Sequence, residues 1–180
     1  MKKNNIQNYV LDEENGRKVR YVGQYYVTNV PAKARRKSAI CKLAAGGLEL
    51  LLILAAISVN CLGSRKAYII LPLELILFCA LYYLIGAYTY LKSGDRIEQK
   101  VYDKAYSNPV QIVTVAAVLN LIALIGQAML VIRQAEELNG YGDYTFLAIL
   151  MGLLVLHILM WKQQKCLFGQ IEPEKQTEFE

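Results

Sequence analysis

Residues 37–61 read KSAICKLAAGGLELLLILAAISVNC, and this stretch decides the fold. Between Lys42 and Arg65 the only charged residue is Glu49. About 20 apolar residues in a row are enough for a helix to cross the ~30 Å hydrocarbon core of a bilayer. The stretch therefore predicts a membrane-spanning helix that carries one glutamate near its middle.

Three further apolar blocks follow in the 180-residue chain, of which 55% is hydrophobic and 19% charged. Runs of this length without charge are rare in soluble cores, and helices satisfy their own backbone hydrogen bonds, as a bilayer requires. The predicted fold is an all-α integral membrane protein, in which residues 37–162 form an antiparallel bundle of four transmembrane helices. The predicted spans cover about residues 38–61, 67–91, 109–132 and 144–161.

The lysines and arginines are distributed unevenly over the two sides of the predicted bundle. Seventeen of the 20 precede the first span or lie in it, or occupy the second connection or the C-terminal tail. The three on the other side are Arg65, Lys66 and Arg133. Because cytoplasmic loops carry the excess of positive charge, the count predicts a multi-pass protein of the cell membrane with both termini in the cytoplasm.

Two polar segments flank the predicted bundle. Residues 1–36 form a cytoplasmic N-terminal segment, and its first 16 residues are typical of disorder. Within residues 17–30, two β-prone runs flank a Gly-Gln pair, a pattern typical of a small hairpin. Residues 163–180 form an acidic cytoplasmic tail ending EPEKQTEFE, which is also predicted to be disordered.

A polybasic run at residues 33–37 directly precedes the first span, and its charges are Lys33, Arg35, Arg36 and Lys37. Basic clusters can bind nucleic acids, but a cluster beside a span more often meets anionic lipid headgroups. We therefore expect these four side chains to contact headgroups on the cytoplasmic side, and we expect no nucleic-acid partner.

The predicted spans contain polar residues that are candidates for a functional site. Charged groups in hydrocarbon cost at least ~2.5–3.5 kcal/mol at the bilayer centre, so they mark function by default. If all of them face the bundle axis, they form a polar column suited to protons or cations, with the histidine as a relay. The alternative is that they hold the helices together by hydrogen bonds. The five residues are Glu49, Glu74, Asn120, Gln127 and His157.

The fourth predicted span has two faces that cannot both pack on the same neighbour. One carries His157, and the opposite one carries the small residues Ala148 and Gly152. Small residues allow helices to approach closely. Either His157 faces the bundle and the small residues form an oligomer contact, or the reverse.

Catalytic and cofactor motifs are absent from the sequence. It contains no HExxH, GxSxG, Walker or GxGxxG pattern, a single histidine, and four cysteines without a CxxC pair. We therefore expect no metal, no cofactor and no enzymatic activity. The favoured function is a partner-binding or accessory subunit of a membrane assembly, with a membrane-protein partner or a homo-oligomer. The alternative is a small oligomeric proton- or cation-coupled transporter or channel that uses Glu49 and Glu74.

Overall fold

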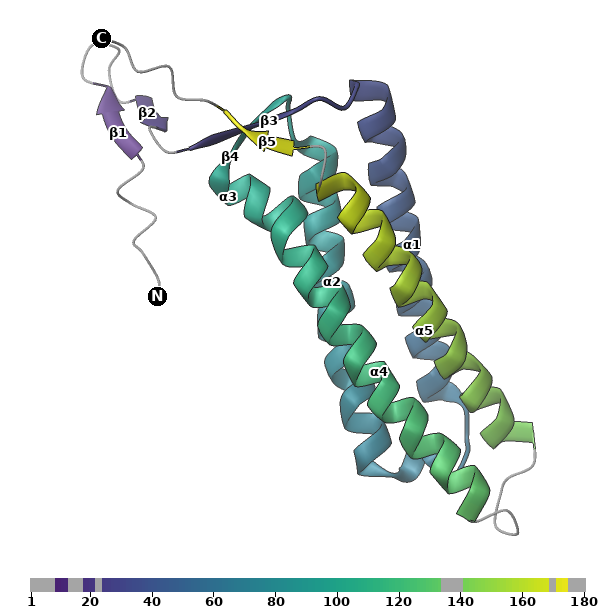
Figure 1. Cartoon of the computed structure of the whole chain (residues 1–180). Helices are drawn as coiled ribbons and strands as arrows, with labels where there is room; N and C mark the ends of the chain where they lie inside the picture. The colour runs from purple at the N-terminus through teal and green to yellow at the C-terminus, as the bar shows by residue number, and fades with distance from the viewer. Residues whose placement is uncertain (1–8, 13–17, 22–23, 134–140, 169–170, 175–180) are drawn as a thin grey trace.

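Four long helices form the main body of the computed structural model, which describes residues 9–12, 18–21, 24–133, 141–168 and 171–174 (Figure 1). By length and composition, each helix is long and apolar enough to cross a membrane. The prediction of four long apolar helices is thus confirmed. They are α1 (Ala32–Ser58), α2 (Ala67–Lys92), α4 (Asn108–Arg133) and α5 (Tyr141–Phe168).

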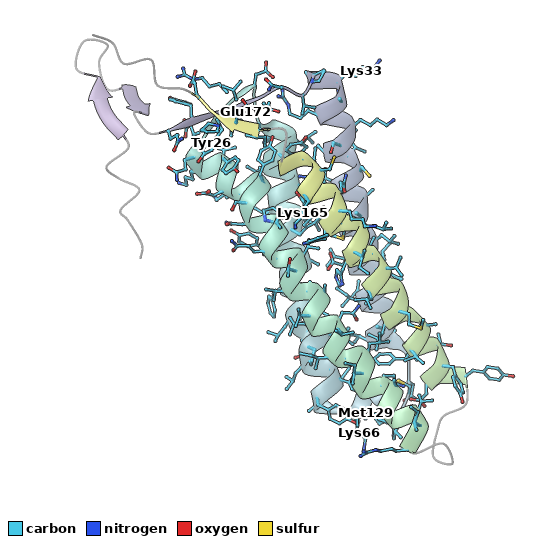
Figure 2. All side chains as sticks on the ribbon, viewed as in Figure 1. Tyr26, Lys33, Lys66, Met129, Lys165 and Glu172 are labelled. Carbon is cyan, nitrogen blue, oxygen red and sulfur yellow. The ribbon has the colours of Figure 1, made fainter. Side chains whose placement is uncertain are left out.

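The helices pack as a closed ring in the order α1, α2, α4, α5, so that α2 and α5 lie at opposite corners. Successive helices run antiparallel (Figure 1). At one end, here called the loop end, a short connection containing the 3-10 turn η2 (Gly63–Arg65) joins α1 to α2. The other end carries a β-sheet and is called the sheet end. Figure 2 shows Tyr26, Lys33 and Glu172 at the sheet end and Lys66 and Met129 at the loop end.

The helix that contains α4 begins well before the predicted third span. A short helix, α3 (Gln99–Tyr102), and a π-helical turn, η3 (Asp103–Ser107), continue directly into α4. Pro109 therefore does not break the chain direction. Its ring removes the N–H that would bond to the carbonyl four residues earlier, which belongs to Ala105. The π turn accommodates this change, as π turns inside helices commonly do.

The sheet corrects the predicted hairpin of residues 17–30. Its two β-prone runs do form strands, β2 (Lys18–Tyr21) and β3 (Tyr25–Thr28), but they do not pair with each other. Strand β2 pairs with β1 (Tyr9–Asp12), and β3 is the centre of an antiparallel sheet between β4 (Arg96–Glu98) and β5 (Ile171–Pro173). A two-stranded hairpin is only marginally stable, whereas a central strand gains two neighbours.

Order also extends into two segments that were predicted to be disordered. Strand β1 lies within the first 16 residues, and the C-terminal tail contributes the last turns of α5 and strand β5. The tail is ordered because it has apolar side chains to bury: Leu167 and Ile171 pack beside Ala39 and Tyr90. The rest of both predictions concerns residues outside the described part of the chain.

Candidate functional site

A buried acid–base pair connects α1 and α5 in the interior of the bundle. Oε1 of Glu49 lies 2.8 Å from Nε2 of His157, and the two residues are only 1% and 0% exposed. This is hydrogen-bonding distance, so the two groups can share or exchange one proton. Nδ1 of His157 is buried and has no hydrogen-bond partner among the described residues. Among the described residues, the hydrogen bond between Glu49 and His157 therefore does not continue through Nδ1 into a longer network.

This contact decides which face of α5 is internal. His157 is buried, whereas Ala148 and Gly152 lie exposed on the opposite side. A Cβ atom added at Gly152 would meet nothing within 4 Å. Of the two alternatives for this helix, the structure has the first: the histidine faces the bundle. A contact between oligomer partners through the small residues stays a prediction.

Asn120 and Gln127 are also fully buried, but each has a partner of its own. Nδ2 of Asn120 donates a hydrogen bond of 3.0 Å to the carbonyl of Leu150, which joins α4 to α5. Nε2 of Gln127 donates to both the carbonyl and Oδ1 of Asp143, at 3.3 and 3.2 Å. These side chains connect helices in the way that polar residues do in membrane bundles.

Asp143 is a central residue that sequence analysis missed. It is fully buried in the first turn of α5. Besides Gln127, its Oδ1 accepts the backbone N–H groups of Leu62 and Gly63, at 3.1 and 3.3 Å. One carboxylate thus joins the α1–α2 connection to α4 and α5. An aspartate in a first turn is a recognisable helix-start signal, but backbone partners in a distant loop leave no pattern in the sequence.

Lys42 is the second buried charge that sequence analysis did not single out as a site. Its residue is 0% exposed, and Nζ lies 4.1 Å from the ring centroid of Tyr90 and 5.5 Å from that of Tyr106. Nζ also donates to the carbonyl of Ala105 at 3.5 Å. This is the carbonyl that Pro109 leaves without its α-helical donor. Two aromatic faces and one carbonyl together replace the water that a lysine normally binds.

Stacked tyrosines extend from Lys42 to the sheet. Tyr90 meets Tyr106 edge to face at 5.1 Å, Tyr106 stacks on Tyr102 at 5.7 Å, and Tyr102 stacks on Tyr26 of β3 at 3.9 Å. The four rings come from α2, η3, α3 and β3. They form one aromatic row that fixes the sheet to the bundle and ends on the buried cation.

Glu74 lies elsewhere, on the outer side of α2. Leu71, Leu75 and Phe78 beside it are also exposed, Phe78 by 66%. The condition for a polar column of all five residues, that each faces the bundle axis, is therefore not met by Glu74. Helix α2 is apolar all round, so its hydrophobicity gives no preference for the side that packs.

The polybasic run separates into one structural and three surface residues. Arg35 is 9% exposed, and its Nη1 lies 2.7 Å from Oδ1 of Asp95, in the connection after α2. Lys33, Arg36 and Lys37 are exposed. Arg35 therefore stabilises the sheet end, and the other three remain candidates for headgroup contact. Arg35 and Arg36 also line a surface hollow of about 370 Å³.

Metal-ligating side chains do not gather in the described residues, where no three histidine, cysteine, aspartate or glutamate residues form a group that could hold an ion. The sulfur atoms of the four cysteines are not joined as disulfides, and Cys61 alone is buried. The described interior holds three arrangements of charged groups: the Glu49–His157 pair, Asp143 with its donors, and Lys42. The rings of Tyr90 and Tyr106 and the carbonyl of Ala105 around Lys42 are called the Lys42 cradle below.

Replacing Lys42 by methionine tests the cradle. The variant keeps the length of the side chain and loses the cation, so we expect the free energy of unfolding to fall by about 2 kcal/mol, as for a desolvated cation–π contact. The measurement is equilibrium unfolding of the purified protein in mild detergent by titration with sodium dodecyl sulfate. The exposed Lys37→Met is the matched control and should change little. Equal stability of both variants and the wild type would contradict this role of Lys42.

Comparison with known proteins adds no assignment to these contacts. No family model matches the chain, and neither does any curated protein or solved structure. The function must therefore be argued from the residues and geometry described above.

Proposed function

We propose that the protein is a non-enzymatic subunit of a membrane assembly, and that it binds a membrane-protein partner through the outer face of α2. The observation that carries this proposal is the exposed Glu74 among the exposed apolar residues Leu71, Leu75 and Phe78. In this proposal the buried polar groups stabilise the bundle, and the exposed carboxyl of Glu74 binds the partner.

Insertion in a bilayer is the first step of the argument. Many exposed side chains along the middle of the helices are large and apolar, for example Leu51, Ile85, Ile125 and Val155. A bundle in water would present polar residues on this surface. Apolar residues on both the inside and the outside suit a solvent of hydrocarbon, and large exposed apolar surfaces of this kind mark membrane or protein contacts.

Orientation follows from charge. Seventeen of the 20 lysines and arginines belong to segments at or leading to the sheet end, and Arg65, Lys66 and Arg133 belong to the loop end. By the positive-inside rule, the sheet end would face the cytoplasm. The exposed Lys33, Arg36 and Lys37 would then lie where anionic headgroups gather.

Glu74 would lie within the hydrocarbon in this arrangement. It is seven residues from the start of α2 at the loop end, or roughly 10 Å along the helix axis at ~1.5 Å per residue. A carboxyl group facing acyl chains is costly, by up to several kcal/mol. A partner that covers Glu74 and satisfies its oxygens would remove this cost, and this gives the outer face of α2 its role in assembly.

The alternative function, a proton- or cation-coupled transporter using Glu49 and Glu74, has less support. The first carboxyl is inside the bundle and bonded to His157, whereas the second is outside. A path through the protein would have to pass between the helices to use both. If proteoliposomes nevertheless showed a proton flux that Glu49→Gln abolishes, the transporter would replace the present proposal.

Site-specific photocrosslinking tests the proposed partner contact. A photoreactive phenylalanine at Leu75, the exposed residue next to Glu74 on α2, should give one adduct of defined mass in native membranes. The same group at Leu51, exposed on the outer side of α1 and equally far from the loop end, is the control and should give none. Glu74→Leu should abolish the adduct at Leu75 and Glu74→Asp should retain it. An adduct at Leu75 that persists in the Glu74→Leu variant, or adducts of equal yield at Leu75 and at the control position, would refute the proposal.

A further inference from the structure

We propose that the partner covers Glu74 with a transmembrane helix that carries a lysine or arginine at the same depth, in the half of the membrane nearer the loop end. This inference rests on the proposed function and names the chemistry of its partner. It is carried by three observations, which concern the surroundings of Glu74, the symmetry of a contact between two copies, and the cations that a second copy could offer.

The surroundings of Glu74 leave its carboxyl unsatisfied. Among the described residues no side chain hydrogen-bonds to it or pairs with it, although Glu49, Asp95 and Glu174 each have a basic partner. Its exposed neighbours one turn away, Leu71 and Phe78, offer no donor. The group that satisfies it must therefore come from another molecule in the hydrocarbon region.

A second copy of this chain, related by a two-fold axis, does not supply that group. A two-fold contact through the outer face of α2 uses the same patch on both molecules and would place Glu74 opposite Glu74. Two carboxylates facing each other repel, and neither offers a donor unless one is protonated. The symmetric dimer therefore adds electrostatic repulsion to the cost of holding the Glu74 carboxylate in hydrocarbon without a donor.

A head-to-tail contact between copies fails for a different reason. It would need a lysine or arginine on the outer side of another helix, at the depth of Glu74. The described residues of α1, α4 and α5 have none in that half, apart from Arg133 at the very end of α4. Arg133 lies at the loop end itself, roughly 10 Å nearer the membrane surface than Glu74.

A basic residue on a different transmembrane helix resolves both difficulties. A lone lysine or arginine in hydrocarbon is as costly as a lone glutamate, so each residue destabilises its own unassembled chain. Association brings the two together and forms a charge-assisted hydrogen bond in a medium of low dielectric constant. Complementary charge also excludes helices that are apolar or acidic at this depth, and so confers specificity.

Designed host helices give a direct test. The full-length protein is reconstituted in phosphatidylcholine vesicles with a single-pass leucine–alanine helix that bears one lysine at the depth of Glu74. Two control helices bear leucine there, or the lysine about ten residues further toward the sheet end. Fluorescence energy transfer then reports association. We expect the matched lysine helix to bind roughly tenfold more tightly than either control.

Exchange of the charges completes the experiment. Glu74→Leu should abolish the preference for the lysine helix, and Glu74→Lys should transfer it to a host helix that carries glutamate. A preference that survives Glu74→Leu, or no preference in the wild type, would overturn the inference. Self-association that Glu74→Leu abolishes, without a preference for lysine, would assign the face to a second copy and also overturn it.

The proposed function and this inference can fail separately. A crosslinked adduct that depends on Glu74, together with indifference to the lysine helix, would keep the partner-binding function and reject its basic chemistry. A strong preference for lysine without any adduct in native membranes would reject the function and keep the complementarity of the surface.

Discussion

Leucine in place of His157 is expected to lower the free energy of unfolding by about 3 kcal/mol, because a buried group that loses its hydrogen-bond partner costs about 1–3 kcal/mol, and more when it is charged. The carboxyl of Glu49 would remain in the interior, 1% exposed, without the partner that now lies 2.8 Å away. Glu49→Leu should have an effect of similar size, because it leaves Nε2 of His157 without a partner.

The double replacement separates two contributions to stability. One is the cost of burying a single polar group without a partner, and the other is the net stabilisation from the hydrogen bond between Glu49 and His157. With both residues changed to leucine, no polar group is left behind, and the loss of stability should be much smaller than the sum of the two single losses. Direct hydrogen bonds in membrane bundles contribute only about 0.6 kcal/mol on average, so most of each single effect should come from the orphan. Additive effects in a double-mutant cycle, measured by detergent unfolding, would show that the two residues act independently.

Conservative replacement adds a second readout. Glu49→Gln keeps a polar group that can bond to Nε2 of His157 but removes any negative charge. If the contact acts as a neutral hydrogen bond, this variant should lose far less stability than Glu49→Leu. If it acts as an ion pair, the two variants should be similarly unstable.

Alanine in place of Asp143 is expected to have the second large effect, a loss of about 3 kcal/mol. The change removes the acceptor of the N–H groups of Leu62 and Gly63 and one of the two bonds of Gln127 Nε2, which keeps its bond to the carbonyl of residue 143. Each buried donor left unsatisfied costs about 1–3 kcal/mol. Water at the loop end should recover part of this loss. The expected loss of unfolding free energy is therefore closer to the cost of one unsatisfied donor than to the summed cost of all of them.

Asp143→Asn is the matched control, because its side-chain oxygen can still accept from the same donors. We expect it to lose about 1 kcal/mol, since the acceptor is then neutral. Hydrogen exchange should rise at Leu62 and Gly63 in the alanine variant and remain slow in the asparagine variant. Equal exchange in the two variants would contradict the assigned role of Oδ1.

The bundle was predictable because its signals are long and local. Runs without charge identified the four helices, and the polar candidates Glu49, Asn120 and Gln127 within these runs are buried in the structure. Helix α2 is apolar on all sides, so its pattern does not show which side packs, and the exposure of Glu74 could not be predicted from it.

The contacts that were missed depend on residues far apart in the sequence. The pairing of β3 with β4 and β5 joins three distant segments, and short strands carry too little pattern to choose among possible neighbours. Two of the partners of Asp143 are backbone N–H groups, which almost every residue has. The Lys42 cradle depends on Pro109 through the carbonyl of Ala105, a relation that becomes visible only when both helices are in place.

Strand β3 has a consequence for the order of events during synthesis. It leaves the ribosome before any of the four helices, yet its two neighbours come from the connection after α2 and from the segment after α5. One edge stays open until residue 173 has been made, which at 5–20 residues per second takes roughly 7–30 s after β3 has been made. The three-stranded sheet can therefore be completed only after all four helices have been synthesised. Its completion joins the segment before α1 to the segment after α5.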